Sequence, residues 1–272
     1  MKRFAVVTGA SSGIGLQYAR VLACEYRYNI VLVSNQEKEL ADAAAAITAE
    51  SGVETRTLCL NLAESTAANQ VYDFCKQNAL DVEVLINDAG MLIFQPLLTT
   101  PEAKLETMLM LHMVTLTKLC RLFAADMAAK GLTMHNAQCT MKGYILNMSS
   151  MTAWMAMPGI QCYNATKGYV LNFSRAFWYE MQREHVHVLA VTPGSTDTGL
   201  LPFTPGFAKL LRLAGITMAP EKLVRRALKV LFTTRRKRCM PGAWNYIIVP
   251  IINHLPDWVV FAAMKRLAVF KV

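Results

Sequence analysis

The chain has 272 residues, of which 54% are hydrophobic and 17% charged, a composition that fills a large core and excludes disordered, acidic-tail and collagen-like proteins. Its 28 Lys and Arg against 19 Asp and Glu give a net charge of +9, which favours anionic binding partners such as phosphates, an acidic carrier protein or an anionic membrane face. The cations are dispersed apart from Arg235–Arg238, which we interpret as a solvated surface turn, so nucleic-acid binding is not expected.

The cysteines and the N-terminus indicate a cytoplasmic protein. Seven cysteines form an odd set without a Cys-x-x-Cys pair, which is typical of reduced thiols. The apolar stretch after Met1 ends at Thr8, too early for a signal-peptide core, and later uncharged stretches are broken before they could cross a bilayer. His185 and His187 have no other ligand type at suitable spacing, so we expect a surface pair on a strand and predict no metal site.

Short β-branched runs alternate with longer amphipathic segments along the chain. The predicted buried strands are 4–8, 30–34, 55–60, 84–87, 144–148 and 186–192. From Leu105 to Met127 apolar side chains recur at steps of three and four, which predicts one long helix with a heavily buried face. The alternation predicts a doubly wound, mostly parallel sheet with helices on both faces and ligands at the carboxyl ends of its strands.

The first predicted strand leads into a glycine-rich turn, residues 8–15, and then into a helical pattern. In such a turn Gly9 permits a sharp reversal, Gly13 permits close approach of the backbone to a pyrophosphate, and Gly15 permits close packing of helix on strand. The helix N-terminus would face the phosphate charge. The position between strand and helix therefore predicts a dinucleotide site.

Further motifs follow the glycine turn in a fixed order. They are Asn87-Asp88-Ala89-Gly90, Asn147-Met148-Ser149-Ser150, Tyr163-Asn164-Ala165-Thr166-Lys167 and the segment from Pro193-Gly194 to Thr198. Together these motifs resemble those of the short-chain dehydrogenase/reductase family over about residues 4–200. The resemblance implies a Rossmann-type α/β fold with a seven-stranded sheet, a single domain over 1–272, and hydride transfer with a nicotinamide cofactor.

Tyr163 and Lys167 are four residues apart on a predicted helix and so share a face. An ammonium beside a phenol is expected to lower the pKa of the phenol. The resemblance implies that Ser150 hydrogen-bonds the substrate carbonyl, that Tyr163 protonates it, and that Lys167 lowers the Tyr163 pKa and holds the nicotinamide ribose. His112 stands where the family has an Asn, and we interpret it either as a core histidine or as a fourth catalytic residue that relays protons.

The resemblance also implies a set of cofactor-binding residues: Gly9, Ser11, Ser12, Gly13, Ile14, Gly15, Ser34, Asn35, Lys38, Asn61, Leu62, Asn87, Ala89, Gly90, Tyr163, Lys167, Pro193, Gly194, Thr196 and Thr198.

The residues after the second strand bear on the choice of cofactor. They include neither an acidic group for the ribose hydroxyls of NAD nor an Arg for the extra phosphate of NADP. Because Ser34, Asn35 and Lys38 can donate to a phosphate, we predict a preference for NADPH, with NAD as the alternative. Asn61 and Asp88 replace a family Asp and Asn, and both keep small polar side chains. We expect these changes to adjust dinucleotide binding only modestly. The alternative is that the chain is a catalytically inactive member of the family.

The predicted substrate wall is apolar. Ser150, Trp154, Met155, Leu200 and Phe203 are its candidate residues, and a loop of about 199–218 is expected to order over it. Such a wall suits an alkyl chain or another lipid-like ligand. The apolar, aromatic and basic segment of about 241–272 could lie on a membrane surface, cap the pocket or form a subunit contact.

The leading hypothesis is a cytoplasmic NADPH-dependent reductase of a ketone on an acyl or lipid-like substrate. The first guess is a 3-oxoacyl thioester of coenzyme A or of acyl carrier protein, since the positive charge of the chain would suit either carrier. Pro241-Gly242 and the tail also look like those of 3-ketoacyl reductases and hydroxysteroid dehydrogenases. The alternatives are a hydroxysteroid or other alcohol dehydrogenase, and a non-catalytic dinucleotide-binding or membrane-associated module. The resemblance further implies a homodimer or homotetramer that pairs through residues 101–130 and 161–183.

Overall fold

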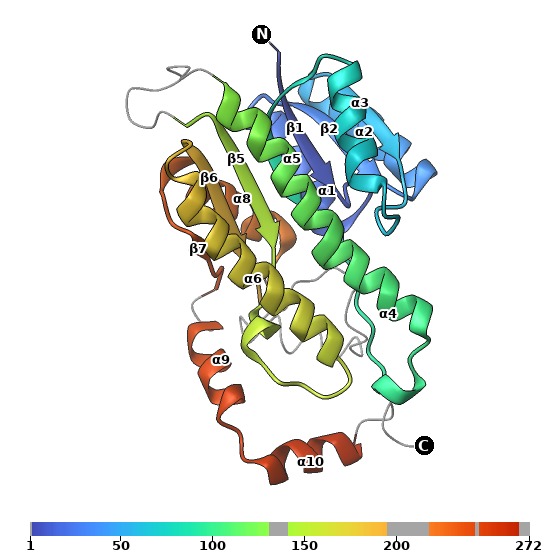
Figure 1. The fold of residues 1–272 in the computed structure, drawn as a ribbon, viewed down its shortest axis with the longest axis vertical. Coiled ribbons are helices and arrows are strands. Elements are labelled where there is room, and N and C mark those ends of the chain that lie inside the picture. The colour runs from blue at the N-terminus through green and yellow to red at the C-terminus, as the bar shows by residue number, and fades with distance from the viewer. Residues whose placement is uncertain (1, 131–140, 195–217, 243–244, 267–272) are drawn as a thin grey trace.

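A single parallel sheet forms the centre of the computed structural model, which describes residues 2–130, 141–194, 218–242 and 245–266. Its strands are β1 (Arg3–Thr8), β2 (Asn29–Ser34), β3 (Thr55–Cys59), β4 (Asp81–Asn87), β5 (Gly143–Met148), β6 (Val186–Val191) and β7 (Arg238–Cys239). They lie in the order β3-β2-β1-β4-β5-β6-β7 (Figure 1). The order reverses between β1 and β4, which is where a doubly wound sheet opens a ligand crevice. The predicted fold class is confirmed.

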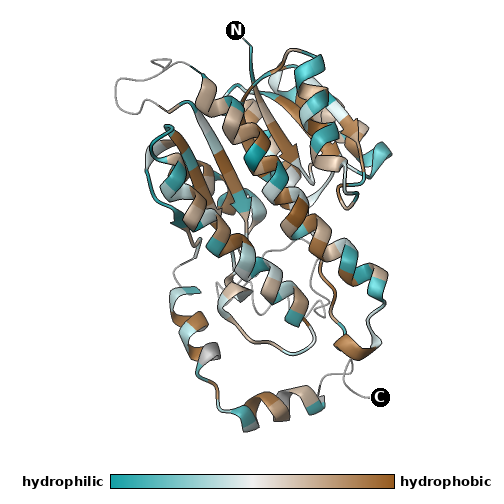
Figure 2. Ribbon diagram, in the orientation of Figure 1, coloured by the Kyte–Doolittle hydropathy of each residue, from teal (hydrophilic) through white to brown (hydrophobic). Residues whose placement is uncertain are grey.

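Helices cover both faces of the sheet. One apolar cluster lies under α1 (Gly13–Cys24), α2 (Glu37–Ser51) and α8 (Pro220–Thr233). The other lies under α3 (Ala67–Gln77), α5 (Leu116–Ala129) and α6 (Gln161–Met181). In Figure 2 the central strands carry the brown of hydrophobic residues, whereas the helices alternate between brown and teal. The core is therefore two layers of side chains, one on each face of the sheet.

The strand over 55–60 differs from its prediction as a buried strand. β3 is the edge strand next to β2; Thr55 and Leu58 are half-buried, and its other three residues are exposed. An edge strand has a neighbour on one side only, and charged side chains such as Arg56 suit the solvated edge.

The predicted long helix is interrupted. Its first part is α4 (Glu102–Leu109), and a π-helical segment, η2 (Met110–Thr115), joins it to α5. Such π segments often mark functional positions, and this one contains His112. By length and composition the whole stretch Glu102–Ala129 could cross a membrane, yet 44% of its most apolar window is buried, and it packs against α3, β4 and β5. It is a core helix of the α/β fold.

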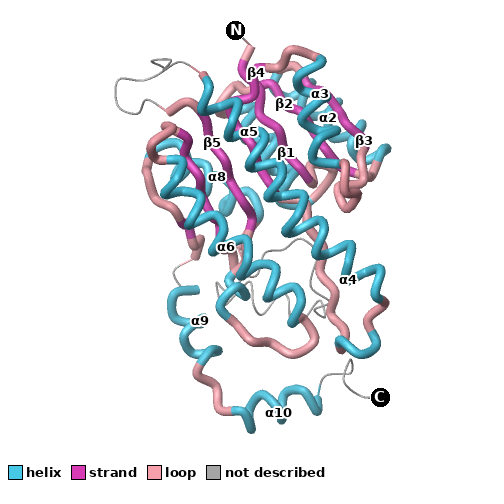
Figure 3. The backbone as a smooth tube through the Cα atoms, in the orientation of Figure 1, coloured by secondary structure: helices cyan, strands magenta, loops and turns pink. Residues whose placement is uncertain are grey.

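The last two helices lie beyond the carboxyl ends of the strands. They are α9 (Asn245–Asn253), which contacts the 3₁₀ turn η3 (Met151–Trp154), and α10 (Asp257–Arg266). Figure 3 traces the chain from the sheet through α9 to α10. A second 3₁₀ turn, η1 (Leu97–Thr99), precedes α4. The predicted substrate loop of about 199–218 lies outside the described residues except for Met218.

Candidate active site

The turn between β1 and α1 has the backbone that its glycines predict. Gly9 and Gly13 have φ angles of 70° and 59°, a region that favours glycine. A Cβ at Gly15 would lie 2.2 Å from the carbonyl oxygen of Gly9, whereas a Cβ at Gly13 would meet nothing within 4 Å. The N-cap residue Ser12 makes no side-chain capping hydrogen bond to α1. The open space beside Gly13 at the start of α1 fits a phosphate of a dinucleotide.

A polar cluster joins this turn to the end of β2. Ser11 Oγ lies 2.8 Å from Ser34 Oγ and donates to Gln36 Oε1 at 2.7 Å. Asn35 and Lys38 are exposed beside the cluster. The sequence analysis did not name Gln36 as a site residue. The only feature that could have indicated it was its position directly after the second strand. These groups lie where the resemblance places the adenosine ribose.

Thr8 holds the segment that follows β4. Its hydroxyl donates to the carbonyl of Ile86 at 3.3 Å and accepts from the backbone N–H groups of Asp88 and Ala89, both at 3.1 Å. Because Thr8 ends β1, the hydroxyl fixes the loop at Asp88 against the phosphate turn. Sequence reasoning treated Thr8 only as the first letter of the glycine motif and missed this role.

Asn87 and Asn147 form a buried polar bridge between β4 and β5. Asn87 Nδ2 donates to Asn147 Oδ1 at 2.8 Å, and Asn147 Nδ2 donates to Ser174 Oγ of α6 at 3.0 Å. Asn61 and Leu62 make local contacts instead: Asn61 Oδ1 accepts from the N–H of Ala63 at 3.1 Å, and Leu62 is buried. The bridge fixes α6 relative to the two strands that end at the crevice.

Asp88 brings a carboxylate to the centre of this site. A Cβ at Gly15 would lie 2.9 Å from Asp88 Oδ2, so the carboxylate lies against the start of α1. Burial raises the pKa of Asp88 to about 7, while the charge of Lys167 and the Gly15 N–H act to lower it. The sequence analysis expected a modest polar replacement here. The structure shows a titratable charge facing Lys167 instead.

Ser150 is oriented by its neighbour Thr152. The backbone N–H and the hydroxyl of Thr152 both donate to Ser150 Oγ, at 3.1 and 3.0 Å. Since the Ser150 oxygen accepts both bonds, its own hydroxyl acts as a donor, and Tyr163 is its partner in this structure. Ser149 donates to the carbonyl of Lys167 at 2.7 Å, a structural bond within the core.

Tyr163 and Lys167 lie one turn apart on α6, as their spacing predicts. Lys167 Nζ is 5.6 Å from the centre of the Tyr163 ring and donates to the carbonyl of Met148 at 2.9 Å. Burial raises the pKa of Tyr163 to about 12, although a hydrogen bond with Ser150 acts to lower it. The expected lowering of the Tyr163 pKa by Lys167 is therefore wrong for this structure, because desolvation of the phenol outweighs the effect of nearby donors. Burial also lowers the pKa of Lys167 to about 8, against the raising effect of Asp88.

His112 is buried and uses both ring nitrogens. Its Nε2 accepts from the backbone N–H of Met91 at 3.0 Å, so the ring proton resides on Nδ1, which lies 2.9 Å from Thr166 Oγ1. Thr166 in turn donates to the carbonyl of Tyr163 at 2.9 Å. Burial, and next the charge of Lys167, hold the pKa of His112 well below its usual value. The two hydrogen bonds fit a core histidine, with a backbone N–H as its partner.

The Pro193-Gly194 segment lies against the serine motif and α9. The carbonyl of Pro193 accepts from the N–H of Met151 at 2.9 Å, and a Cβ at Gly194 would lie 2.3 Å from Asn245 Oδ1. Met155 is buried, and Trp154 is half-buried beside them. Four other predicted residues lie outside the described part of the chain, namely Thr196, Thr198, Leu200 and Phe203.

The histidine pair differs from its interpretation as a surface pair. His187 is buried in β6, and its ring nitrogens lie 2.7 Å from the carbonyl of Leu231 and 2.9 Å from that of Arg236. His185 precedes the strand in a turn with a φ of 57°. The described residues contain no group of three or more His, Cys, Asp or Glu side chains that could hold a metal.

Comparisons with known proteins agree with this geometry. Residues 3–204 match the family model for short chain dehydrogenase. The human very-long-chain 3-oxoacyl-CoA reductase is 28% identical over 262 residues, which cover 94% of this chain and 76% of that protein. A 7β-hydroxysteroid dehydrogenase structure has a TM-score of 0.79 at 26% identity and covers 96% of both chains. A Sphingobium yanoikuyae short-chain dehydrogenase in complex with NADPH has a TM-score of 0.75 at 26% identity, covering 98% of this chain and 96% of that one.

We expect Asp88→Asn to move the alkaline limb of the pH profile for ketone reduction to lower pH. The Asp88 charge raises the pKa values of both Lys167 and Tyr163, so its removal lets both groups lose their protons at lower pH. A shift of about one unit in kcat/KM would fit the loss of one neighbouring charge. Asp81→Asn, at the other end of β4 and paired with Lys130, is the matched control. Superimposable profiles for Asp88→Asn and wild type would refute the coupling.

We expect His112→Ala to destabilise the protein without removing a limb from the pH profile of kcat. The substitution leaves the buried N–H of Met91 without its acceptor, which costs about 1–3 kcal/mol. Urea unfolding measures that loss, and His112→Asn should recover part of it because an amide oxygen can accept. If His112→Ala abolishes a titration in the pH profile instead, the histidine acts as a relay.

Proposed function

Because this chain belongs to the short-chain dehydrogenase family and is an NAD(P)-dependent oxidoreductase, we propose that it reduces the ketone of a 3-oxoacyl-CoA or related lipid-like thioester to a secondary alcohol. The observation that carries the proposal is the convergence of Ser150, Tyr163 and Lys167 at the carboxyl ends of β5 and β6, next to the phosphate turn. When bound, the reduced nicotinamide supplies a hydride to the ketone carbon.

The chain's own residues hold the carbonyl and supply the proton. Thr152 fills the lone pairs of the Ser150 oxygen, so the Ser150 hydroxyl acts as a donor. We expect it to turn from Tyr163 to the carbonyl oxygen of the substrate when the substrate binds. Tyr163 gives its phenolic proton to the same oxygen as negative charge develops there. Lys167, anchored on Met148, places its ammonium near Tyr163 and the expected ribose position. We infer that His112 is a positioning residue, which ties the loop at Met91 to the catalytic helix.

The raised pKa of Tyr163 keeps the phenol in the protonated form that reduction requires. With a pKa of about 12, the phenol stays protonated at neutral pH and is ready to donate. Oxidation of an alcohol would need the phenolate as a base, which is scarce at that pH. A hydroxysteroid or other alcohol dehydrogenase remains the second candidate, because a 7β-hydroxysteroid dehydrogenase is similar over 96% of this chain.

The preference for NADPH is part of the proposal. Ser11, Ser34 and Gln36 gather hydroxyl and amide groups at the end of β2, and Lys38 adds a cation in the first turn of α2. No ion pair of the described residues involves Lys38. A similar short-chain dehydrogenase was solved with NADPH, which supports a cofactor with the extra phosphate.

We further propose a cytoplasmic protein that touches a membrane peripherally through α9 and α10. Both helices expose large apolar side chains: Tyr246, Ile247, Ile251, Trp258 and Phe261. An apolar, tryptophan-bearing helix flanked by a cation such as Lys265 suits the interface of a bilayer, and sedimentation with lipid vesicles tests it. The stacked rings of Tyr169, Phe173 and Phe177 on α6 support pairing of two copies through the long helices.

We expect wild-type protein to oxidise NADPH in the presence of 3-oxoacyl-CoA substrates and Tyr163→Phe to lose about 100-fold or more of that activity. Removing the hydroxyl removes the proton donor but leaves the ring, so dinucleotide binding should persist. Tyr169→Phe is the matched control, since that hydroxyl bonds Thr117 away from the site. A wild-type protein that binds dinucleotide but reduces no ketone of a broad panel would be a non-catalytic module.

We expect Lys38→Gln to raise the KM for NADPH about tenfold, equivalent to about 1.4 kcal/mol, and to leave the KM for NADH unchanged. The reason is that only NADPH carries a phosphate for the ammonium group. Steady-state kinetics with both cofactors measure the ratio. A strong wild-type preference for NADH would contradict the assignment.

A further inference from the structure

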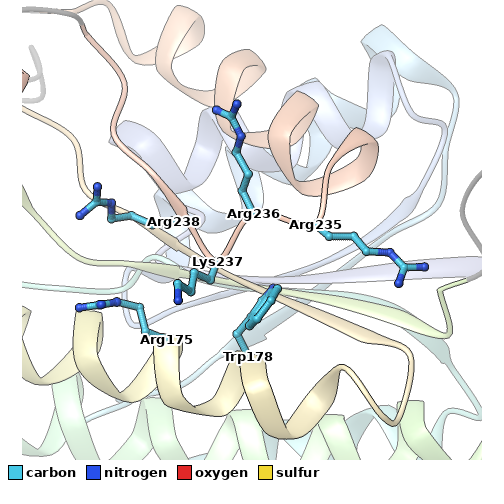
Figure 4. A pocket seen from close by; sticks show the side chains of 6 residues that line it. All are labelled: Arg175, Trp178, Arg235, Arg236, Lys237 and Arg238. Carbon is cyan, nitrogen blue, oxygen red and sulfur yellow. The ribbon is translucent and has the colours of Figure 1, made fainter.

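A basic groove lies between α6 and the loop that enters β7. Its volume is about 420 Å³, and it is lined by Arg175, Trp178, Arg235, Arg236, Lys237 and Arg238. Figure 4 shows Arg175 and Arg238 extending to the left, with Lys237 between them and Trp178, whereas Arg236 points to the top of the view and Arg235 to the right. The volume falls within the usual range for small-molecule sites, about 300–1,000 Å³.

The cations of this groove have no acidic partners. None of the ion pairs among the described residues includes any of the five, and no Asp or Glu lines the groove. A hydrogen bond from Lys237, and next the charges of Lys237 and Arg175, lower the pKa of the exposed Tyr179. Like charges gathered in this way repel one another. The cluster does not stabilise the fold by itself, and an anion would relieve the repulsion.

Aromatic rings lie among these cations. Lys237 Nζ is 5.7 Å from the ring centre of Trp178 and 4.4 Å from that of Tyr179. The indole nitrogen of Trp178 is buried and has no hydrogen-bond partner among the described residues. Guanidinium groups bind phosphates through paired N–H bonds, and an indole ring offers a face for a nucleobase. The combination suits a phosphorylated nucleotide better than a bare phosphate.

The loop that carries the cations is fixed to the sheet. His187 of β6 contacts the carbonyl of Arg236 at 2.9 Å, and the N–H of Ala190 donates to the carbonyl of Lys237 at 3.2 Å. Arg238 is the first residue of β7. The backbone that carries the cations is therefore held in place before a ligand arrives.

One lining residue of the groove, Arg238, lies beside the turn that begins after Ser150. The guanidinium carbon of Arg238 lies 5.2 Å from the ring centre of Trp154, the last residue of η3. Ser150 is the N-cap of that same turn. A substrate that reacts at Ser150 and carries phosphates on a long arm could thus pass Trp154 and place those phosphates among the cations.

We propose that this groove binds the phosphorylated adenine nucleotide of a coenzyme A thioester while the acyl group occupies the catalytic site. Arg175, Lys237 and Arg238 contact the phosphates, Trp178 contacts the base, and Arg235 and Arg236 add to the positive field. The assignment rests on the proposed function, since it takes a coenzyme A thioester as the substrate. It makes this groove the element that recognises the carrier of the acyl chain.

The test compares one 3-oxoacyl chain on two carriers, coenzyme A and N-acetylcysteamine, which lacks the nucleotide. For the double variant Arg175→Gln/Lys237→Gln, we expect the KM for the coenzyme A thioester to rise about tenfold or more, with kcat and the kinetics of the N-acetylcysteamine thioester unchanged. Raised salt should weaken only the coenzyme A substrate. Arg121→Gln, an exposed cation on α5 outside the groove, should alter neither.

Direct binding separates this inference from the proposed function. Calorimetric titration with free coenzyme A should show binding to wild type and at least a tenfold weaker affinity for the double variant, even if neither thioester is turned over. Equal effects of the variant on both thioesters, or unchanged affinity for coenzyme A, would overturn the assignment. The assignment would also be overturned if the double variant bound coenzyme A as wild type does but lost binding to anionic lipid vesicles or turnover of an acyl carrier protein substrate.

Discussion

The burial of the Lys167 ammonium is the constraint on which the site depends. The side chain is 6% exposed, donates to the carbonyl of Met148, and faces the carboxylate of Asp88 across the crevice. A buried ammonium that lacks compensation would lose its proton. Asp88 supplies that compensation from the loop after β4. The charge of Lys167 on α6 is therefore balanced by a residue from another part of the sheet. The same carboxylate accepts the N–H of Gly15 at the phosphate turn.

Side chains at the strand ends hold the separate motifs in one geometry. Thr8 fixes the loop after β4, Thr152 fixes the proton of Ser150, and the pair Asn87 and Asn147 ties two strands to α6. The π-helical segment belongs to the same arrangement, because it carries His112 between the loop at Met91 and the catalytic helix. Each of these groups is neutral, and together they leave Asp88 and Lys167 as the charged pair at the crevice.

The sequence predicts the parts of this arrangement that depend on local pattern. Strand runs, the glycine turn and the four-residue spacing of Tyr163 and Lys167 are local, so the fold and the meeting of the motifs at the carboxyl edge follow from them. Properties that depend on burial between elements distant in the sequence do not follow from local pattern. The pKa of Tyr163 rises where a fall was expected, because the packing around the ring removes water from it. His187 and the π-helical segment are further examples, since their partners lie in α8 and at Met91.

The position of β7 also bears on the solubility of the chain. An edge strand exposes unpaired N–H and C=O groups on which the sheet of another molecule can grow. Here that edge strand is two residues long and is preceded directly by three further cations. If two copies paired through this edge around a two-fold axis, the cations of one copy would face and repel those of the other. The last strand thus discourages aggregation through this edge of the sheet.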